Sequence, residues 1–473
     1  MTGLRNKRIG KLFCLCALLI VSLYGLTAFA ELPPLFGGKA AFMVGQKIET
    51  LDPAQRLTEA ERQVSLLAYE TLFVLRDGRA IDWLSSKHRF ENGDRDLHVW
   101  LKPDIILHDG STMQTAHVRK SFEYVLKASS GTTGQELLLP IKGANKLVSG
   151  EGDELSGFEI VSDYEFVLHL EKADSGFDRA LCEVQTSITG RKRRIGSGTY
   201  KIENISPKGV RLALNDRHHK GRAYLDRLEF AYASGVAEER RKLDRGAYSG
   251  TFSGRILKSR KGRAFIAPGT AAVMLDFNPR RKSDSALWNE LLRSAFDCRQ
   301  AVRLFEPRRH APFEGDVKKP SFAGVKAPGA NERGLLELSE MLIGRSCKGF
   351  EINEGKARGL AESLPEKSLR LLVRKSDAAL DLIAQRMALM LEPYGVKVEV
   401  LSLGASGYKS KLASGDYEAE LYVSSALQKT GGRKELEVYR VFRGGLISDE
   451  NLKGIGFDAL GFFRLEDLWE AAK

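Results

Sequence analysis

The chain has 473 residues, with 73 Lys and Arg against 61 Asp and Glu, and its formal net charge is +12. This length is enough for two or three structural units with substantial cores. The basic residues form short, scattered runs, which argues against nucleic acid as a partner because no single stripe with interleaved aromatic residues is present. These runs are explained as solvated faces; a cleft for an anionic ligand, or contact with a membrane surface, is the minority alternative.

Residues 1–30 have the features of a cleavable signal for export. An apolar run and the small-residue pattern Ala28-Phe29-Ala30 follow a basic start, which is formed by Arg5, Lys7, Arg8 and Lys11. We expect cleavage after Ala30, so that the mature chain begins at Glu31 in the periplasm and carries four fewer positive charges. A retained membrane anchor is the alternative. The residues before Cys14 and Cys16 do not match a lipoprotein processing site.

Three cysteines remain after this cleavage: Cys182, Cys298 and Cys347. In an oxidising compartment one pair can be bridged, and Cys298 with Cys347 is the pair that would close a loop of modest length. The mature sequence has no C-x-x-C motif, and the adjacent His218 and His219 have no partner at ligand spacing. The sequence therefore predicts no metal site and no cofactor.

The first half of the chain is predicted to alternate short strands and helices. The polar–apolar alternation at 97–101 and 165–170 is typical of half-buried strands, and the spacing of apolar residues at 64–72 is typical of a helix. In chain order we expect a strand ending at 51–53, a helix with the apolar stripe Val64, Leu67, Ala68 and Leu72, and a turn at Asp77-Gly78. A strand at 97–101, a turn at 108–110 and a helix capped by Thr115 are expected next. The last expected elements of this half are a hairpin turning at Ser162-Asp163, a strand pair within 196–216 and a strand at 224–232.

From Ala271 the sequence changes to a regular alternation of strands and helices. The expected elements are a strand at 272–278, a helix at 284–296, a passage rich in Pro and Gly at 307–329, a helix at 332–344, and then strand, helix, strand, helix and strand between 369 and 425. Such alternation predicts an α/β lobe.

Seven motifs in a fixed order give the sequence a specific resemblance. They are "LDPA" with "LAYETLFV" (51–54 and 67–74), "HVWLKPDIILHDGSTMQTAHVRKSFEYVL" (98–126), "GFEIVSDYEFVLHL" (157–170), "GSGTYKI" (196–202), "LNDRHHKGRAYLDRLEF" (214–230), "MLDFNPRRKSDSALWNELLRSAFDCRQAV" (274–302) and "IAQRMALMLEPYGVKVEVLSLGASGYKSKLASGDYEAELY" (383–422). Each motif alone is weak. Together they resemble the extracytoplasmic solute-binding proteins of family 5, which serve peptide, dipeptide and nickel importers of the ABC type.

This resemblance implies an α/β fold, namely the two-lobe fold of periplasmic binding proteins (type II), with an accessory subdomain in the first lobe. The implied first lobe comprises residues 31–270 plus 425–473, with the accessory subdomain at about 55–185, and the second lobe comprises 271–424. The resemblance makes the turn at His108-Asp109-Gly110 a framework feature. It implies a monomer that is not an enzyme, binds a small-molecule or peptide-like solute, and delivers it to an ABC permease in the inner membrane.

A first set of site residues follows from where the motifs place strand ends and chain crossings. The ligand-binding candidates are Glu49, Thr50, Asp52, Tyr69, Glu70, Val423, Ser424 and Ser425. The hinge candidates are Leu275, Asn278 and Tyr422. For each candidate, packing in the framework is an equal alternative to contact with a ligand.

The sequence departs from the family pattern after residue 422. Peptide binders of the family continue with a Trp-containing segment and an Asp-Pro corner, whose acid can pair with the α-amine of a peptide. Here the only acids between Tyr422 and Gly445 are Glu435 and Glu437, and the C-terminal part is shortened. Because a buried ammonium needs a paired carboxylate, we expect no free peptide amine in the cleft, and an anionic or neutral solute, or none.

Two other function classes stay open. A binding fold that has lost transport could serve as a sensor or could bind a protein partner, and the shortened C-terminal part favours this alternative. A secreted hydrolase is less well supported, because the sequence has neither a G-x-S-x-G nor an H-E-x-x-H motif.

Overall fold

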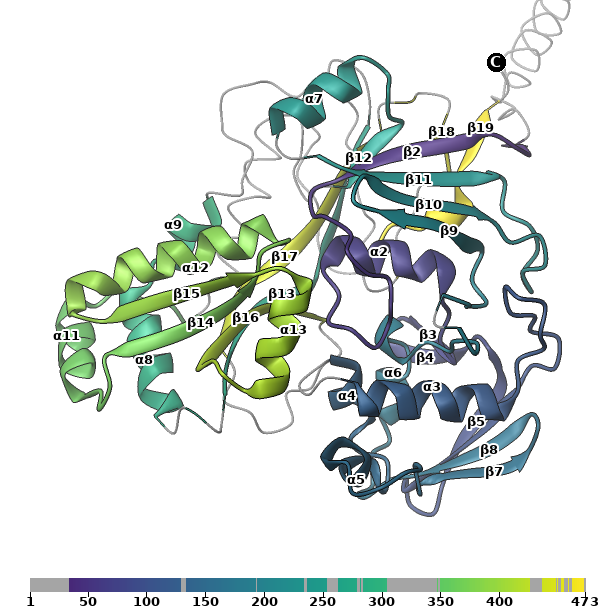
Figure 1. Cartoon of the computed structure of the whole chain (residues 1–473), viewed down its shortest axis with the longest axis horizontal. Helices are drawn as coiled ribbons and strands as arrows, with labels where there is room; N and C mark the ends of the chain where they lie inside the picture. The colour runs from purple at the N-terminus through teal and green to yellow at the C-terminus, as the bar shows by residue number, and fades with distance from the viewer. Residues whose placement is uncertain are drawn as a thin grey trace, which may run out of the picture.

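The structure is a computed structural model, and it consists of two lobes that share one long sheet (Figure 1). The α/β two-lobe fold expected from the sequence is confirmed. The strand order of the ten-stranded sheet is β15-β14-β16-β13-β17-β12-β2-β11-β10-β9. The described residues are 34–128, 133–192, 194–233, 236–252, 263–278, 281, 284–303, 347, 349–425, 436–447, 449, 452–454, 458 and 462–471.

Two long antiparallel strands at the middle of this sheet connect the lobes. They are β13 (Arg263–Phe277) and β17 (Leu436–Ile447). The register between them shifts between Ala267 and Ala271, where the sheet passes from one lobe to the other. The backbone of each strand therefore belongs to both lobes.

The first lobe is built on the β12–β9 end of the sheet. Strand β2 pairs in parallel with both β11 and β12, and it contributes Phe42 to a core that also contains Tyr200 and Leu228. The elements of this part are β2 (Lys39–Val44), α2 (Glu59–Ala68), β9 (Tyr200–Ser206), β10 (Gly209–Leu214), β11 (Arg227–Tyr232), α7 (Val236–Asp244) and β12 (Gly250–Phe252).

The C-terminal residues pack on the first lobe. Strand β19 (Trp469–Ala471) pairs with β1 (Pro34–Leu35) on one side and with β18 (Leu452–Lys453) on the other. Leu465, in the short helix η3 (Leu465–Asp467), is buried in the first-lobe core. The chain thus returns along β17 to the lobe in which it began.

An accessory subdomain with its own core projects from the first lobe (Figure 1). It contains a four-stranded sheet of order β5-β6-β8-β7 and the hairpin β3-β4. Its elements are β3 (Phe73–Arg76), β4 (Arg79–Asp82), β5 (Ser85–Glu91), β6 (Asp96–Leu101), α3 (Thr115–Lys127), α4 (Thr133–Leu138), α5 (Ala144–Ser149), β7 (Phe158–Ser162), β8 (Glu165–His169), α6 (Phe177–Ala180) and η1 (Val184–Thr186).

Two of the turns predicted in this subdomain join antiparallel strands, and both hairpins are confirmed. Asp77 and Gly78 have φ angles of 49° and 75° and join β3 to β4, as a two-residue hairpin loop with the favoured twist requires. Strands β7 and β8 form the predicted hairpin, in which Ser162 is the last residue of β7 and Asp163 begins the turn that leads to Glu165. The alternation in β8 buries Phe166 and Leu168.

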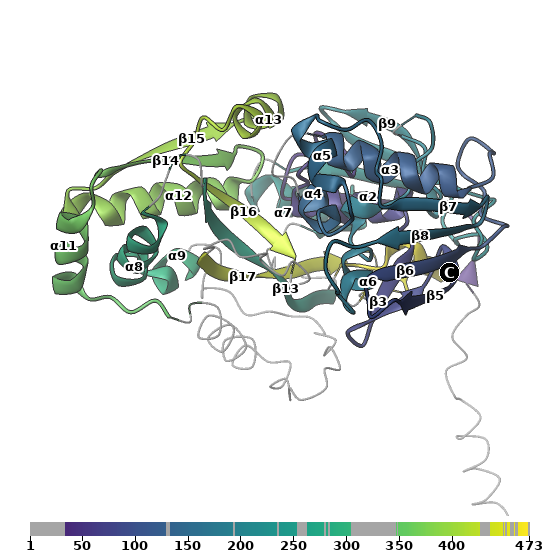
Figure 2. The same ribbon diagram turned by 90° about the horizontal axis from the view of Figure 1, so that it is seen from below.

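The second lobe has helices on both faces of a partly parallel sheet. Strand β14 pairs in parallel with β15 and β16, and its alternating side chains separate the two faces. Leu371 joins a core with α8 and α12, whereas Leu372 packs against α13 on the other face (Figure 2). The elements are α8 (Ser285–Ala295), α9 (Cys298–Arg303), α11 (Glu354–Ser363), β14 (Ser368–Arg374), α12 (Ala378–Leu391), η2 (Glu392–Tyr394), β15 (Lys397–Leu403), α13 (Ala405–Ser414) and β16 (Ala419–Ser425).

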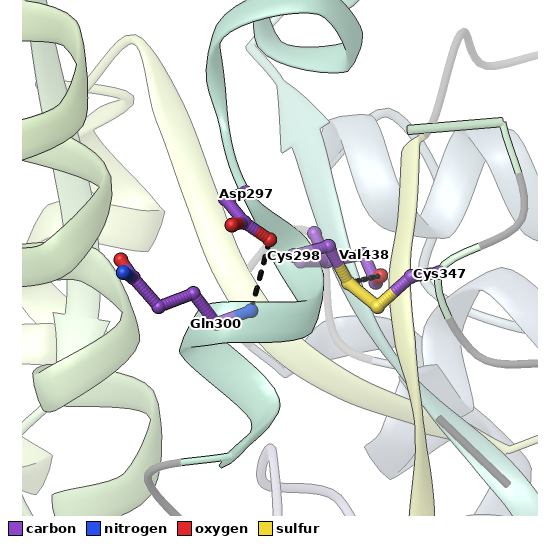
Figure 3. Close-up of a disulfide and its surroundings, with 5 residues drawn as sticks. All are labelled: Asp297, Cys298, Gln300, Cys347 and Val438. Carbon is purple, nitrogen blue, oxygen red and sulfur yellow. Dashed lines mark hydrogen bonds between the residues drawn. A yellow bond between two sulfur atoms is a disulfide. The ribbon is translucent and has the colours of Figure 1, made fainter. Parts of the chain in front are cut away.

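A disulfide between Cys298 and Cys347 closes part of the second lobe (Figure 3), and this confirms the predicted pairing. The Sγ atom of Cys298 lies 3.1 Å from the carbonyl oxygen of Val438 on β17. The bridge therefore sits against the strand that leads back to the first lobe. Cys182 is free and buried, and burial raises the pKa of its thiol.

Three local predictions are wrong. Leu72 does not belong to the apolar stripe of the helix, because α2 ends at Ala68. The strand expected to end at 51–53 is instead β2, which ends at Val44, because the backbone N–H groups of Glu49 and Thr50 bond to the Glu61 side chain and not to a neighbouring strand. Thr115 is the first residue of α3 and not its N-cap; its hydroxyl donates to the Ser162 carbonyl.

Several predictions fall on residues outside those described. They are the signal at 1–30, the passage at 307–329 and the helix at 332–344. Among the helices that the structure describes, none combines the length and apolar character needed to cross a membrane.

Candidate functional site

The two lobes meet through buried polar and charged side chains. We call this set the interlobe network. It lies where α2 and the loop before it face α13 and the ends of β14 and β16 (Figure 1). Its first-lobe members are Gln46, Glu49, Arg56 and Glu61, and its second-lobe members are Arg374, Asp377, Tyr408, Glu420 and Tyr422.

Glu61 is the acceptor at the centre of the first-lobe half. It is the third residue of α2, and it forms a capping box with Thr58, whose backbone N–H donates to Glu61 Oε2 at 2.8 Å. Glu61 Oε1 also accepts the backbone N–H groups of Glu49 and Thr50, at 2.9 and 3.1 Å. Three backbone donors thus hold a fully buried carboxylate in one orientation.

Arg374, the last residue of β14, donates hydrogen bonds to the Glu61 carboxylate from the second lobe. Its Nη1 donates to Glu61 Oε2 at 2.7 Å, and its Nη2 donates to Glu61 Oε1 at 2.8 Å, so the pair is bidentate. Nη1 also donates to the Arg56 carbonyl, and Nη2 lies 3.3 Å from Glu49 Oε2. Burial alone would lower the pKa of Arg374, but Glu61 and Glu49 outweigh it and raise the pKa.

In a second buried ion pair, the arginine belongs to the first lobe and the carboxylate to the second. Arg56 of the first lobe places Nε 3.2 Å from Glu420 Oε1 on β16, and its guanidinium lies 4.2 Å from the centre of the Tyr422 ring. The Tyr408 hydroxyl donates to the same Glu420 oxygen. Burial raises the pKa of Glu420, although Arg56 and Tyr408 act against this rise.

A third contact completes the network. Gln46 Nε2 donates to Asp377 Oδ2 at 2.6 Å, while Gln46 Oε1 accepts the backbone N–H of Ala60 in α2. The other oxygen of Asp377 caps α12 by accepting the Leu380 N–H. The contact therefore ties the start of α2 to the start of α12.

A junction of this composition can separate without exposing a large apolar core. When the lobes separate, the polar groups of the network replace their ion pairs and hydrogen bonds with hydrogen bonds to water. The free-energy cost of this exchange is small compared with the cost of leaving one partner buried and unpaired. The arrangement therefore favours two states, one with the network intact and one with both halves in water.

The structure brings four of the sequence-predicted residues to or near this network. Glu49 belongs to it, and Tyr422 belongs to it as the partner of Arg56. Thr50 donates its N–H to Glu61. Asp52 lies in the same loop but accepts the Tyr124 hydroxyl at 2.5 Å, which anchors the loop to α3 of the accessory subdomain.

The other predicted residues lie elsewhere. Tyr69 is buried in the first-lobe core, and burial raises its pKa. Val423 is in the second-lobe core and Ser424 is buried on β16. The backbone of Ser425 pairs with Ala271. Ligand contact by these residues stays a prediction.

Two predicted hinge residues lie inside the second lobe. Leu275 is in its core, and the Asn278 side chain donates to the carbonyls of Gly415 and Tyr417. The register shift between Ala267 and Ala271 lies closer to the passage between lobes. The hinge assignment of Leu275 and Asn278 also stays a prediction.

Glu70 is separated from the network and has its own buried partners. Its Oε1 atom lies 2.9 Å from His218 Nε2 and 3.1 Å from His219 Nε2, and it accepts the Trp83 indole N–H at 2.7 Å. Burial alone would raise the pKa of Glu70, but the hydrogen bonds and charges of the two histidines lower it. The adjacent histidines, without a partner at ligand spacing in the sequence, thus have one in space.

Sequence reasoning missed Arg56, Arg374, Glu61 and Glu420. Glu61 had a signal, since Thr58-x-x-Glu61 is the pattern of a capping box. Arg374 follows the apolar residues of β14. This pattern indicates the end of a strand, but it does not predict which residue pairs with Arg374. Arg56 and Glu420 are 364 residues apart in the chain, and only the fold pairs them.

Comparison with known proteins gives one family match. Residues 83–304 match the model described as bacterial extracellular solute-binding proteins, family 5 middle region. One curated relative, the uncharacterized protein YhjP of Bacillus subtilis (strain 168), is 23% identical over 201 residues. That match covers 42% of this chain and 32% of YhjP, so the chain matches about a third of the relative's length.

Solved structures share the fold over nearly the whole chain. The oligopeptide-binding protein AppA of Bacillus subtilis, in complex with a nonapeptide, matches with a TM-score of 0.66 at 14% identity and covers 93% of this chain and 100% of AppA. The murein tripeptide binding protein MppA of Escherichia coli gives 0.68 at 14% identity, covering 94% and 100%. An unliganded open form of MppA gives 0.52 at 14% identity, covering 94% and 99%.

Proposed function

The chain has the two-lobe fold and, over residues 83–304, the sequence pattern of family 5 bacterial extracellular solute-binding proteins, and from this premise we propose that it captures a solute between its lobes and delivers it to an ABC permease. In this proposal the chain binds without catalysis. The permease supplies the transport step, and closure of the lobes presents the solute to it.

The observation that carries the proposal is the interlobe network. Each lobe contributes one buried arginine, Arg56 or Arg374, and each arginine pairs with a carboxylate of the other lobe. In this proposal these contacts form when the lobes close. A solute that adds contacts to both lobes would shift the equilibrium towards closure by its differential affinity for the closed state.

The segment after Tyr422 supports an anionic or neutral solute. The carboxylate that would hold a peptide amine is missing between Tyr422 and Gly445: Glu435 lies outside the described residues, and Glu437 lies on β17, opposite Met274. A free peptide N-terminus therefore has no evident partner in that segment.

The disulfide supports an exported protein. Bridged cysteines persist in oxidising compartments and are rare in the cytosol of most organisms. The Cys298–Cys347 bridge and the predicted signal at 1–30 are therefore consistent with each other. We propose a periplasmic location for the mature chain, as a monomer.

A thermal-shift screen tests the solute class. A ligand at about 100 times its dissociation constant should stabilise the fold by roughly 2.7 kcal/mol. We expect stabilisation by organic anions and none by unmodified di- to pentapeptides; N-acetylated peptides and sugars complete the panel. Strong stabilisation by unmodified peptides that is lost on N-acetylation would contradict the proposed class.

A sensor or partner-binding role without transport is the second candidate. The network favours it in one respect, because the side chains of the chain itself join the lobes and could hold them closed without a solute. No stabilisation by any member of the solute panel would favour this role over transport. A permease gene adjacent to the gene of this chain would favour transport.

A further inference from the structure

Glu70, His218 and His219 form a buried cluster outside the interlobe network. Glu70 follows the end of α2, and the two histidines lie in the turn after β10. Their side chains are 7%, 5% and 3% exposed, respectively. One ligand atom from each residue lies within 4.8 Å of those of the other two.

Two imidazole nitrogens and the Trp83 indole nitrogen converge on one oxygen of this cluster. Nε2 of His218, Nε2 of His219 and the Trp83 indole nitrogen all lie 2.7–3.1 Å from Glu70 Oε1. Without an ion, both imidazoles need a hydrogen on Nε2, because an imidazole that turned its Nε2 lone pair towards the carboxylate would be repelled by it.

Hydrogen bonds from neighbouring side chains fix the orientation of the Glu70 carboxylate, as such bonds do for metal ligands in proteins. The Ser197 hydroxyl donates to Glu70 Oε2 at 2.7 Å, and Trp83 donates to Oε1. The turn that carries Ser197 is fixed by His108, whose Nε2 lies 2.9 Å from the Gly198 carbonyl and whose Nδ1 accepts the Gly196 N–H. The predicted framework turn at residue 108 thus supports the position of Ser197.

We propose that Glu70, His218 and His219 bind a divalent first-row transition ion of the zinc class. Two imidazole nitrogens and one carboxylate oxygen are ligands that zinc takes in proteins. Tetrahedral ligands with bonds of about 2.0–2.1 Å lie roughly 3.3–3.4 Å apart. The O–N separations here are 2.9 and 3.1 Å, so each needs to widen by only a few tenths of an ångström.

The ion lies between the Glu70 carboxylate and the two imidazoles. Each imidazole then directs its Nε2 lone pair at the metal, and Trp83 keeps its hydrogen bond to the carboxylate. A water molecule or Glu70 Oε2 supplies the fourth ligand. The site joins the turn after β10 to the end of α2 within the first lobe, so its role is structural and does not depend on the solute.

Metal binding to the untagged full chain tests the site. The protein is stripped with a chelator, dialysed and titrated with Zn²⁺ alone, and its bound metal is counted by mass spectrometry. We expect one Zn²⁺ per chain, a higher unfolding temperature, and no such effect from Mg²⁺ or Ca²⁺, which prefer oxygen ligands. Co²⁺ in place of Zn²⁺ should give the visible absorption of a four-coordinate site with nitrogen ligands.

Variants separate the proposed site from other histidines. His218→Gln and His219→Gln keep a side chain that can donate to Glu70, and both should lose the bound ion; Ser197→Ala should weaken binding by about 10–100-fold. His169→Gln is the matched control, because His169 also contacts two carboxylates, those of Asp96 and Glu159. The proposal is overturned if the wild type binds no Zn²⁺ and gives no Co²⁺ absorption, or if His169→Gln loses the ion while His218→Gln keeps it.

Discussion

Glu61→Gln is expected to lower the free energy of unfolding by about 3–5 kcal/mol, because it leaves the buried Arg374 guanidinium without its counter-charge. The amide NH₂ group would also face an Arg374 nitrogen or a backbone N–H, so that one donor loses its acceptor. Urea unfolding of the variant and of the wild type, with far-UV circular dichroism as the readout, measures the difference.

Glu290→Gln is the matched control for this change. Glu290 pairs with Lys356 at 2.7 Å, but both side chains are 51% exposed, so its loss should change stability by less than about 0.5 kcal/mol. Glu61→Gln combined with Arg374→Met should recover part of the loss, because no buried charge is left unpaired. A loss below about 1 kcal/mol in Glu61→Gln would mean that the pair is not buried as described.

Replacing both Cys298 and Cys347 with serine is expected to destabilise the second lobe by about 4 kcal/mol. The two residues are 49 positions apart, and the chain-entropy estimate for a loop of that length gives this value. The bridge also holds residue 347 against α9 and the strand that returns to the first lobe (Figure 3). Urea unfolding followed by tryptophan fluorescence reports on this lobe through Trp288 in its core.

Reduction of the wild type is the control for the disulfide. Dithiothreitol should destabilise the wild type by a similar amount, and it should have no effect on the double serine variant. Equal stability of the oxidised and the fully reduced wild type, with reduction verified by thiol titration, would contradict the prediction.

The fold was predictable from the sequence where local signals and chain order agreed. The Asp77-Gly78 turn carries the residues that a two-residue hairpin loop requires, and the hairpin predicted near Ser162-Asp163 is also present. The helix predicted at 284–296 is α8, because its apolar spacing buries Trp288 and Leu292 on one face. The prediction of a strand ending at 51–53 is wrong, because the Glu61 side chain, and not a neighbouring strand, accepts the backbone N–H of Glu49.

The site was predictable only in part. Glu49, predicted to bind a ligand, and Tyr422, predicted to be a hinge residue, both lie at the junction of the lobes, but their partners Arg374 and Arg56 were not predicted. The pairing of Arg56 with Glu420, and of Glu70 with His218, joins residues that are far apart in the chain. No local pattern marks such pairs, since the strand order of the sheet decides which residues meet.

The distance between the lobes in solution tests the central claim most directly, namely that the interlobe network closes a two-lobe clamp. Spin labels at Ile160→Cys in the first lobe and Leu389→Cys in the second, both exposed positions, report this distance by pulsed electron paramagnetic resonance. Arg56→Gln with Glu420→Gln removes one of the two buried ion pairs between the lobes and leaves neither charge of that pair without a partner, so the distance distribution should extend to longer values. Glu290→Gln with Lys356→Gln, within the second lobe, should leave the distribution unchanged. The same distribution in all three proteins would show that the lobes form one rigid body and would contradict the account.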